Sequence, residues 1–219
     1  MPVRHHRNTQ KAPDPSRNSG FDDKFMHKYW HYIDLPFSPD GTKLVQPPQI
    51  NAQERIGLLR KTIASDAPDA LKAFDLVWLL HLVGDVHQPL HATSRFTHAG
   101  TKGDAGGNNV KLCKSPCKDE LHAFWDDVLG KEETVSTAII AAGGLPKPDQ
   151  AQASKSDEAE WVQESFQAAQ KWVYVDPIGV GNGPFTPNGA YKANAKKVAE
   201  ERVALAGARL GNLLNTELK

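Results

Sequence analysis

One segment, Ala70–Val86, constrains the fold of this chain more than any other. Its apolar side chains occupy nearly the whole circumference of a helix, which predicts a central helix. The longest apolar run, Leu76–Val83, is interrupted only by His81, so we expect this imidazole to be buried. Pro89 ends or kinks the helix, because proline lacks the backbone donor that a helix interior needs.

Four other segments have helical spacing, and together with the first they predict an all-α chain. They are Ile50–Ala64, Leu121–Leu129, Glu158–Trp172 and Ala190–Leu214. On the last of these, the expected buried stripe is Val198, Val203, Leu205, Ala206, Leu210 and Leu213. Val110–Leu112 is interpreted as one strand of a small β-hairpin, and Ala138–Ala153 as a connection that contains Gly and Pro.

The charge balance excludes one class of function. The 219 residues contain 26 Lys and Arg against 26 Asp and Glu, so the chain cannot hold nucleic acid by bulk positive charge. The longest apolar run is far shorter than the roughly 20 residues that a membrane helix needs. Met1–Asn18 is basic and polar, so no signal peptide is expected in the chain as given.

The histidines suggest a metal site. His81 and Asp85 are four residues apart and therefore point the same way from one helix. His122 and Asp126 repeat this spacing on another predicted helix, and His91 follows Pro89 closely enough to reach the same cavity. His31 and Asp34 offer one more imidazole and carboxylate. Zinc takes these nitrogen and oxygen ligands, and the set could hold two ions.

The alternative to a metal site is ordinary structure. A single His-x-x-x-Asp pair is usually a surface ion pair, and a plain helical bundle with accidental pairs remains a hypothesis. We expect His87 to be an outer-shell or surface group, and His5, His6, His27 and His98 to be exposed. The Asp104–Asn108 segment is a turn signal whose backbone N–H groups could line a site.

The chain has two cysteines, Cys113 and Cys117, in Cys-Lys-Ser-Pro-Cys. The pair alone is a poor zinc site. Its proline favours a tight loop that could close a small disulfide, which would imply an oxidising compartment, and two free thiols are the alternative.

These motifs together resemble the zinc-dependent single-strand-specific nuclease family. The resemblance rests on the sequence from His81 to His91, His-Leu-Val-Gly-Asp-Val-His-Gln-Pro-Leu-His, and on Leu-His-Ala-Phe-Trp-Asp from Leu121 to Asp126. Trp30-His31-Tyr32-Ile33-Asp34 and Gly106-Gly107-Asn108 support it. That family includes fungal, plant and bacterial nucleases and shares its fold with zinc phospholipase C. The resemblance implies a single zinc nuclease-like domain over residues 21–219, after a disordered or truncated remnant at 1–20.

The resemblance also implies roles for individual residues. His31, His81 and Asp85 would hold one zinc ion, and His91, His122 and Asp126 a second, with His81 and Asp85 at the catalytic centre. Asp85 would also bridge to a third ion. Tyr32 would stack on a base, with Asp34 and Asn108 near the bound substrate. The implied substrates are single-stranded DNA or RNA and nucleotides, cleaved to leave 5′-phosphates, in a periplasmic or secreted setting and with no protein partner.

One departure from the family pattern matters. Relatives hold the third zinc ion with an N-terminal Trp and a nearby His, and carry an Asp upstream of the position of His31. None of these is recognisable here, so we expect at most two well-held ions and a weak or inactive nuclease. Two alternatives follow: a phospholipase C-like phosphodiesterase, and an inactive zinc-binding relative.

Overall fold

The computed structural model describes residues 27–113, 119–130 and 134–218. The predicted N-terminal remnant at 1–20, with His5 and His6, and the second cysteine, Cys117, lie outside these residues. Helices dominate the described part, which confirms the predicted all-α class. None of the helices in the described ranges is long and apolar enough to cross a membrane.

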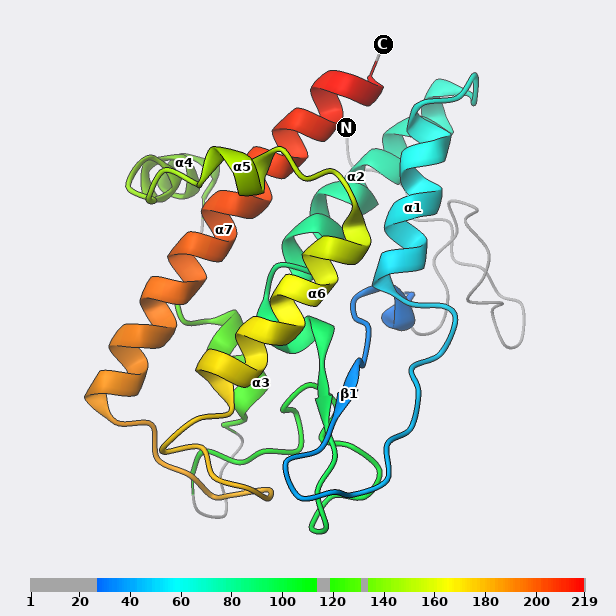
Figure 1. Cartoon of the computed structure of the whole chain (residues 1–219). Helices are drawn as coiled ribbons and strands as arrows, with labels where there is room; N and C mark the ends of the chain where they lie inside the picture. Colours follow the sequence, from blue (N-terminus) through cyan, green and yellow to red (C-terminus); the bar gives the residue numbers. More distant parts are fainter. Residues whose placement is uncertain (1–26, 114–118, 131–133, 219) are drawn as a thin grey trace.

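Four long helices form the main bundle: α1 (Ala52–Ile63), α2 (Asp69–Asp85), α6 (Glu158–Ala168) and α7 (Gly189–Glu217). Figure 1 shows them side by side, with the chain running in opposite directions along α1 and α2. Polar side chains cap three of them at the N-terminus. Asn51, Asp157 and Asn188 each accept a hydrogen bond from a backbone N–H in the first turn, which satisfies a donor that has no partner within the helix. These four helices match four predicted segments closely.

Two hydrophobic clusters fill the interior. The first lies between α1, α2, α6 and the C-terminal half of α7, with Trp30 and Trp161 fully buried. The second lies around α3 (Leu121–Asp126), the π-helical turn η3 (Ala169–Val173) and the start of α7. The short 3-10 helix η2 (Pro89–Ala92) joins them, because Leu90 packs in the second cluster and Ala92 in the first. His91, between these two residues, is therefore held in a fixed place.

The sheet differs from the predicted hairpin. β1 (Pro36–Phe37) and β2 (Ser94–Arg95) pair in parallel, Pro36 with Ser94 and Phe37 with Arg95. The predicted hairpin segment Val110–Leu112 does pair antiparallel with a nearby segment: Lys111 and Glu120 form an isolated bridge, the Leu112 N–H donates to Asp119 O and the Leu121 N–H donates to Val110 O. This pairing is a single bridge rather than a strand, so the two-stranded sheet of the described residues lies elsewhere. Parallel strands so far apart in sequence leave no hairpin turn for a local pattern to reveal.

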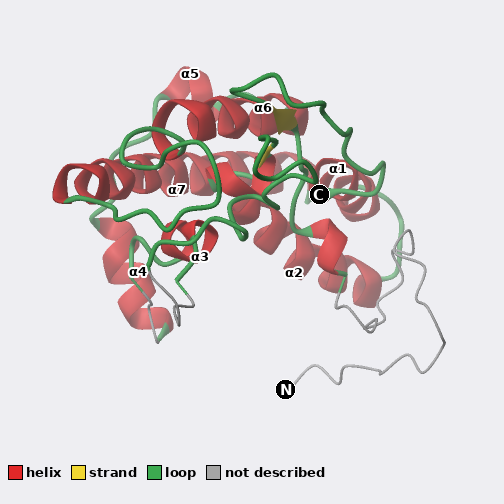
Figure 2. Ribbon diagram, turned by 90° about the horizontal axis from the view of Figure 1, so that it is seen from below, coloured by secondary structure: helices red, strands yellow, loops and turns green. Residues whose placement is uncertain are grey.

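Other boundaries also differ from the prediction. The supposed connection Ala138–Ala153 contains most of α4 (Val135–Gly143) and all of α5 (Gln150–Ala153). α4 has no buried residue and projects away from the bundle (Figure 2), although its sequence is apolar: Val135, Ile139 and Ile140 are exposed. The glycines and prolines that follow in the predicted connection gave it the composition of a loop. The predicted Leu121–Leu129 helix ends early, at Asp126, as α3. On α7, Val203 is exposed, while Arg209 is buried on the face that was expected to be apolar.

Candidate metal centre

Two groups of side chains that could bind a metal ion lie near the C-terminal end of α2. His31 follows the short 3-10 helix η1 (Lys28–Trp30), while His81 and Asp85 come from the last turns of α2. The second group takes His91 from η2, and His122 and Asp126 from α3. All six predicted ligands are thus gathered into the two triads that the sequence predicted.

The first triad has the dimensions of a tetrahedral site. His31 Nδ1 lies 3.0 Å from Asp85 Oδ2 and 3.0 Å from His81 Nε2, and His81 Nε2 lies 3.1 Å from Asp85 Oδ2. Two ligands on a tetrahedral zinc ion, each at about 2.0–2.1 Å, would lie about 3.3 Å apart. The three donor atoms therefore form one face of a coordination tetrahedron.

The second triad is slightly wider. Asp126 Oδ1 lies 3.5 Å from His91 Nε2, and Asp126 Oδ2 lies 3.5 Å from His122 Nε2. Both imidazoles are oriented by backbone carbonyls: His91 Nδ1 donates to His31 O and His122 Nδ1 donates to Gly106 O, each at 2.7 Å. Because the carbonyls hold Nδ1–H in both rings, Nε2 is the nitrogen that faces Asp126. It donates to that carboxylate when the ring is protonated, and it is the nitrogen that could bind a metal ion when the ring is neutral.

Local charge keeps the carboxylates ionised. Burial alone would raise the pKa of Asp85, but hydrogen bonds from His31 and His81 outweigh it and hold that pKa well below its usual range. For Asp126, burial is likewise outweighed by hydrogen bonds from His91 and Gln88, and its pKa is lowered. Both carboxylates are therefore available as anionic ligands, and their donor sets fit zinc.

The triads adjoin each other. His91 Nδ1 lies 4.0 Å from Asp85 Oδ2, and the His91 and His122 rings are 4.8 Å apart between centroids. Asp85 thus stands at the boundary between the two groups. The bridging role that the resemblance implies for Asp85 concerns a third ion, and it stays a prediction.

A cavity of about 430 Å³ opens beside the triads. It is lined by Tyr32, Asp34 and Asn108, the three predicted substrate-binding residues, together with Lys28. Burial, and then the nearby charge of Asp104, raise the pKa of Asp34 to about 6. Burial also raises the pKa of Tyr32 to about 12, so its ring stays neutral. The cavity combines an aromatic face with polar groups next to the candidate metal ligands.

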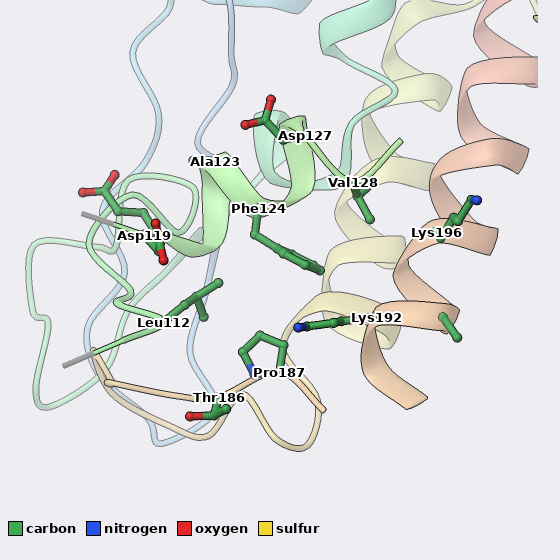
Figure 3. Close-up of a pocket in the computed structure, with 12 residues that line it drawn as sticks. Leu112, Asp119, Ala123, Phe124, Asp127, Val128, Thr186, Pro187, Lys192 and Lys196 are labelled. Carbon is green, nitrogen blue, oxygen red and sulfur yellow. The ribbon is translucent and has the colours of Figure 1, made fainter. Parts of the chain in front are cut away.

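A larger cavity lies elsewhere among the described residues. It has a volume of about 730 Å³ and lies between α3 and the start of α7. Figure 3 shows Phe124 extending toward α7 and Lys192 reaching back toward it. No residue of either triad lines this cavity, so size alone does not identify the chemical centre.

Two histidine predictions were wrong, and for a third residue, His87, one of two alternatives is excluded. The side chain of His81 is 53% exposed, because the α2 face that carries Val77, Leu80 and His81 is not covered by another described element. His27, expected on the surface, is buried and stacks on Trp30 with 4.0 Å between ring centroids. His87 is buried, so it is not a surface group and the outer-shell alternative remains.

His87 belongs to a buried polar network behind the site. Its Nδ1 donates to Val83 O, and Arg209 donates to its Nε2 at 3.0 Å. Burial, and then the charge of Arg202, lower the pKa of His87 to about 3, so the ring is neutral. Arg209 in turn binds both carboxylate oxygens of Glu164, at 2.7 and 2.9 Å. The network fixes the end of α2 against α6 and α7.

Sequence reasoning missed Gln88. Its Nε2 donates to Asp126 Oδ1 at 2.8 Å, and its Oε1 accepts from the Leu90 N–H at the start of η2. Pro89 marks the start of a helix, so the sequence placed Gln88 at an N-cap position, but glutamine is not a favoured N-cap and no pattern pointed to its contact with Asp126. The prediction for His98, in contrast, was right: it is exposed, and it pairs with Asp40 away from both triads.

Comparisons with known proteins agree with this geometry. The family model described as S1/P1 Nuclease matches residues 8–219. Endonuclease 5 of Arabidopsis thaliana is 30% identical over 161 residues, covering 64% of this chain and 49% of that protein. Nuclease S1 of Aspergillus oryzae is 26% identical over 177 residues, covering 72% and 57%. The chain spans about half the length of the curated relatives it matches. Because the family model matches almost the whole length of this chain, the chain belongs to the S1/P1 nuclease family.

Proposed function

We propose that this protein hydrolyses phosphodiester bonds in single-stranded nucleic acid with the help of zinc, and leaves 5′-phosphates. The observation that carries the proposal is the pair of adjoining triads, each with two imidazoles and one carboxylate, beside a cavity with an aromatic wall. His31, His81 and Asp85 would hold one ion, and the second triad another.

The residues of the two triads would act as the metal ligands. Asp85 stays ionised, so it can serve as the anionic ligand of the first site. His91 and His122 keep their protons on Nδ1 and present Nε2 to the second ion. Zinc bound there lowers the pKa of a coordinated water to near neutrality and supplies positive charge toward the phosphate. This local charge removes the need for a basic protein surface.

Single-strand preference follows from the cavity. A base can enter it and stack on Tyr32 only after leaving its partner strand, because a paired base has both faces covered by its neighbours. Asp34 and Asn108 would contact the polar edge of that base. The Asn108 amide is oriented by a hydrogen bond from Nδ2 to Ala105 O at 2.7 Å. A periplasmic or secreted location is part of the same proposal.

The test uses the protein loaded with zinc. Single-stranded DNA, single-stranded RNA, duplex DNA and phosphatidylcholine are offered as separate substrates, and the ends of any nucleic-acid product are analysed. We expect cleavage of the single strands, products with 5′-phosphates and little action on the duplex. Cleavage of phosphatidylcholine alone would support the phospholipase-like alternative. Bound zinc without hydrolysis of any of these would support the inactive relative.

Asp126→Asn is the matched variant, because it keeps the side-chain volume but removes the anionic ligand. We expect it to lose most of the activity. His98→Ala, outside both triads, is the control and should behave as the unmodified chain does.

A further inference from the structure

Gln88 connects the two elements that carry the second triad. Its backbone N–H donates to Asp85 O at 2.9 Å, and its carbonyl accepts from the His91 N–H at 3.1 Å. Its side chain leaves this turn and reaches α3, where Nε2 lies 2.8 Å from Asp126 Oδ1. One residue thus contacts both the turn that carries His91 and the carboxylate opposite it.

The orientation of the Gln88 amide is determined by its partners. The Leu90 N–H can only donate, so it requires the amide oxygen, and Oε1 accepts from it at 2.5 Å. The NH₂ group must then face Asp126, which is an acceptor when ionised. The amide cannot flip without losing both hydrogen bonds, so Gln88 holds a fixed orientation between Leu90 and Asp126.

This contact has a consequence for the carboxylate. Gln88 occupies one lone pair of Asp126 Oδ1, which also lies 3.5 Å from His91 Nε2, and Oδ2 lies 3.5 Å from His122 Nε2. The side chain of Asp126 is 43% exposed, so packing alone does not fix its rotamer. A charge-assisted hydrogen bond is about twice as strong as a neutral one, which makes the Gln88 amide the main restraint on this carboxylate.

We propose that Gln88 is a positioning residue of the second metal site: its amide holds the carboxylate of Asp126 toward the two imidazoles and ties that carboxylate to the turn that carries His91. Two imidazoles and one carboxylate would leave a position open on a bound zinc ion for water or phosphate, as catalytic zinc sites require. The inference rests on the proposed function, because it assumes that this triad binds metal.

Two substitutions separate positioning from simple capping. Gln88→Met keeps the length of the side chain and removes both hydrogen bonds. Gln88→Glu keeps an oxygen for the Leu90 N–H, but it places a second carboxylate where Asp126 now receives a donor. If Gln88 only caps η2, Gln88→Glu should bind zinc as the unmodified residue does.

The measurement is zinc affinity, by competition with a chromophoric chelator. The full chain carries His81→Ala, so that binding at the second triad is observed without the first. We expect both variants to weaken zinc binding about 10- to 100-fold, the usual cost of losing a residue that orients a ligand. The visible spectrum of bound Co²⁺ should also change, because it reports the coordination number. Gln163→Glu, the same change at an exposed position of α6, is the matched control and should leave both readouts unchanged.

The outcomes are distinct. Wild-type affinity or tighter binding in Gln88→Glu, with an unchanged Co²⁺ spectrum, overturns the positioning role. If Gln88→Met fails to fold, as judged by circular dichroism, Gln88→Glu still decides. A chain that binds no zinc at this triad with Gln88 intact refutes the proposed function itself, and so its failure is distinguishable from that of the positioning role.

Discussion

His91 Nδ1 donates a hydrogen bond to the backbone carbonyl of His31 at 2.7 Å, so a ligand of one triad is oriented by the main chain of a ligand of the other. The bond is supported nearby by a second one, from the Ile33 N–H to His91 O at 2.8 Å. The two triads therefore share a backbone frame. A change in one triad that moves this frame should affect both.

His122→Ala tests the composition of the second triad. It removes one of three ligands, so we expect the zinc content to fall by about one ion per chain. Metal analysis of the purified protein by mass spectrometry gives the count. An unchanged zinc content in this variant would show that His122 is not a ligand.

Gly106→Ala tests the loop that orients His122. Gly106 has a φ of +60°, and a Cβ there would lie 2.5 Å from Leu90 O. We expect a loss of about 3 kcal/mol in the free energy of unfolding, from backbone strain together with the clash. Gly130→Ala is the control for strain alone, because Gly130 has a φ of +90° with nothing within 4 Å of its Cβ. It should cost about 1–2 kcal/mol. Urea denaturation compares the two, and equal losses would argue against the clash.

Glu164→Gln tests the buried network behind the site. Arg209 is buried and is paired with Glu164 through both oxygens, so the substitution leaves a buried charge without its anion. We expect a loss of about 2–3 kcal/mol in the free energy of unfolding, below the full cost of breaking a buried pair because Glu164 retains contact with water. Glu160→Gln, at an exposed carboxylate of the same helix, should cost under about 0.5 kcal/mol. Similar losses in both variants would refute the assigned importance of the pair.

The lowered pKa of Glu164 predicts that the folded protein loses stability in acid. Burial would raise the pKa of Glu164, but hydrogen bonds and charge from Arg209 outweigh it and lower the pKa from 4.5 to about 2. A lowered native pKa means that the unfolded chain binds more protons between these values. The stability that Glu164 provides is therefore complete above pH 4.5 and is lost as the pH falls toward 2. The unfolding midpoint of Glu164→Gln should depend less on pH across that interval, and an equal dependence would contradict the assignment.

Asp34 offers a test of the substrate cavity. With its pKa raised to about 6, chiefly by burial, the carboxyl should be neutral below pH 6 and charged above it. Carbon-13 NMR of the metal-free protein follows this titration, with Asp34→Asn identifying the resonance. Addition of zinc should lower the midpoint, because nearby cations favour the carboxylate. A midpoint near 4 without metal would contradict the burial argument.

The pairing of Cys113 with Cys117 stays a prediction, since Cys117 lies outside the described residues. We expect no free thiols in protein recovered from an oxidising compartment, and a stabilisation of only about 2 kcal/mol because the closed loop is short. Titration with a thiol reagent under denaturing conditions measures this directly. Two reactive thiols per chain would refute the disulfide.

Sequence patterns predicted the parts of the fold that repeat with helical period. α1, α2, α6 and α7 each carry a regular apolar face or a polar cap, and their limits fell close to the predicted ones. α4 was missed because its short apolar run lies next to Gly143, Gly144, Pro146 and Pro148, which gave the whole segment the composition of a connection. The pairing of β1 with β2 was missed because contacts between distant segments leave no local signal. Burial of His81 was mispredicted because composition around a helix does not reveal which face stays uncovered.

The candidate ligands were predictable because their spacing in the sequence determines which side chains share a helix face. Residues four apart share a helix face, which places His81 with Asp85 and His122 with Asp126. The groups that orient them were not predictable. Gly106 acts through its backbone carbonyl, and Gln88 acts through contacts made only after α3 packs beside η2. Neither contact can be inferred from the spacing of residues in the sequence.

The parallel pairing of Pro36 with Ser94 and of Phe37 with Arg95 affects how the centre assembles. His31 meets Asp85 across 54 positions of sequence, and this pairing is one of the contacts that hold the two segments together. Closing so long a loop costs chain entropy before any contact is gained. A metal ion at the first triad would therefore act as a cross-link between distant segments, and part of its binding energy would appear as folding energy. Refolding with zinc present should then be favoured in proportion to zinc concentration, which makes the supply of metal a determinant of how much chain reaches the native state.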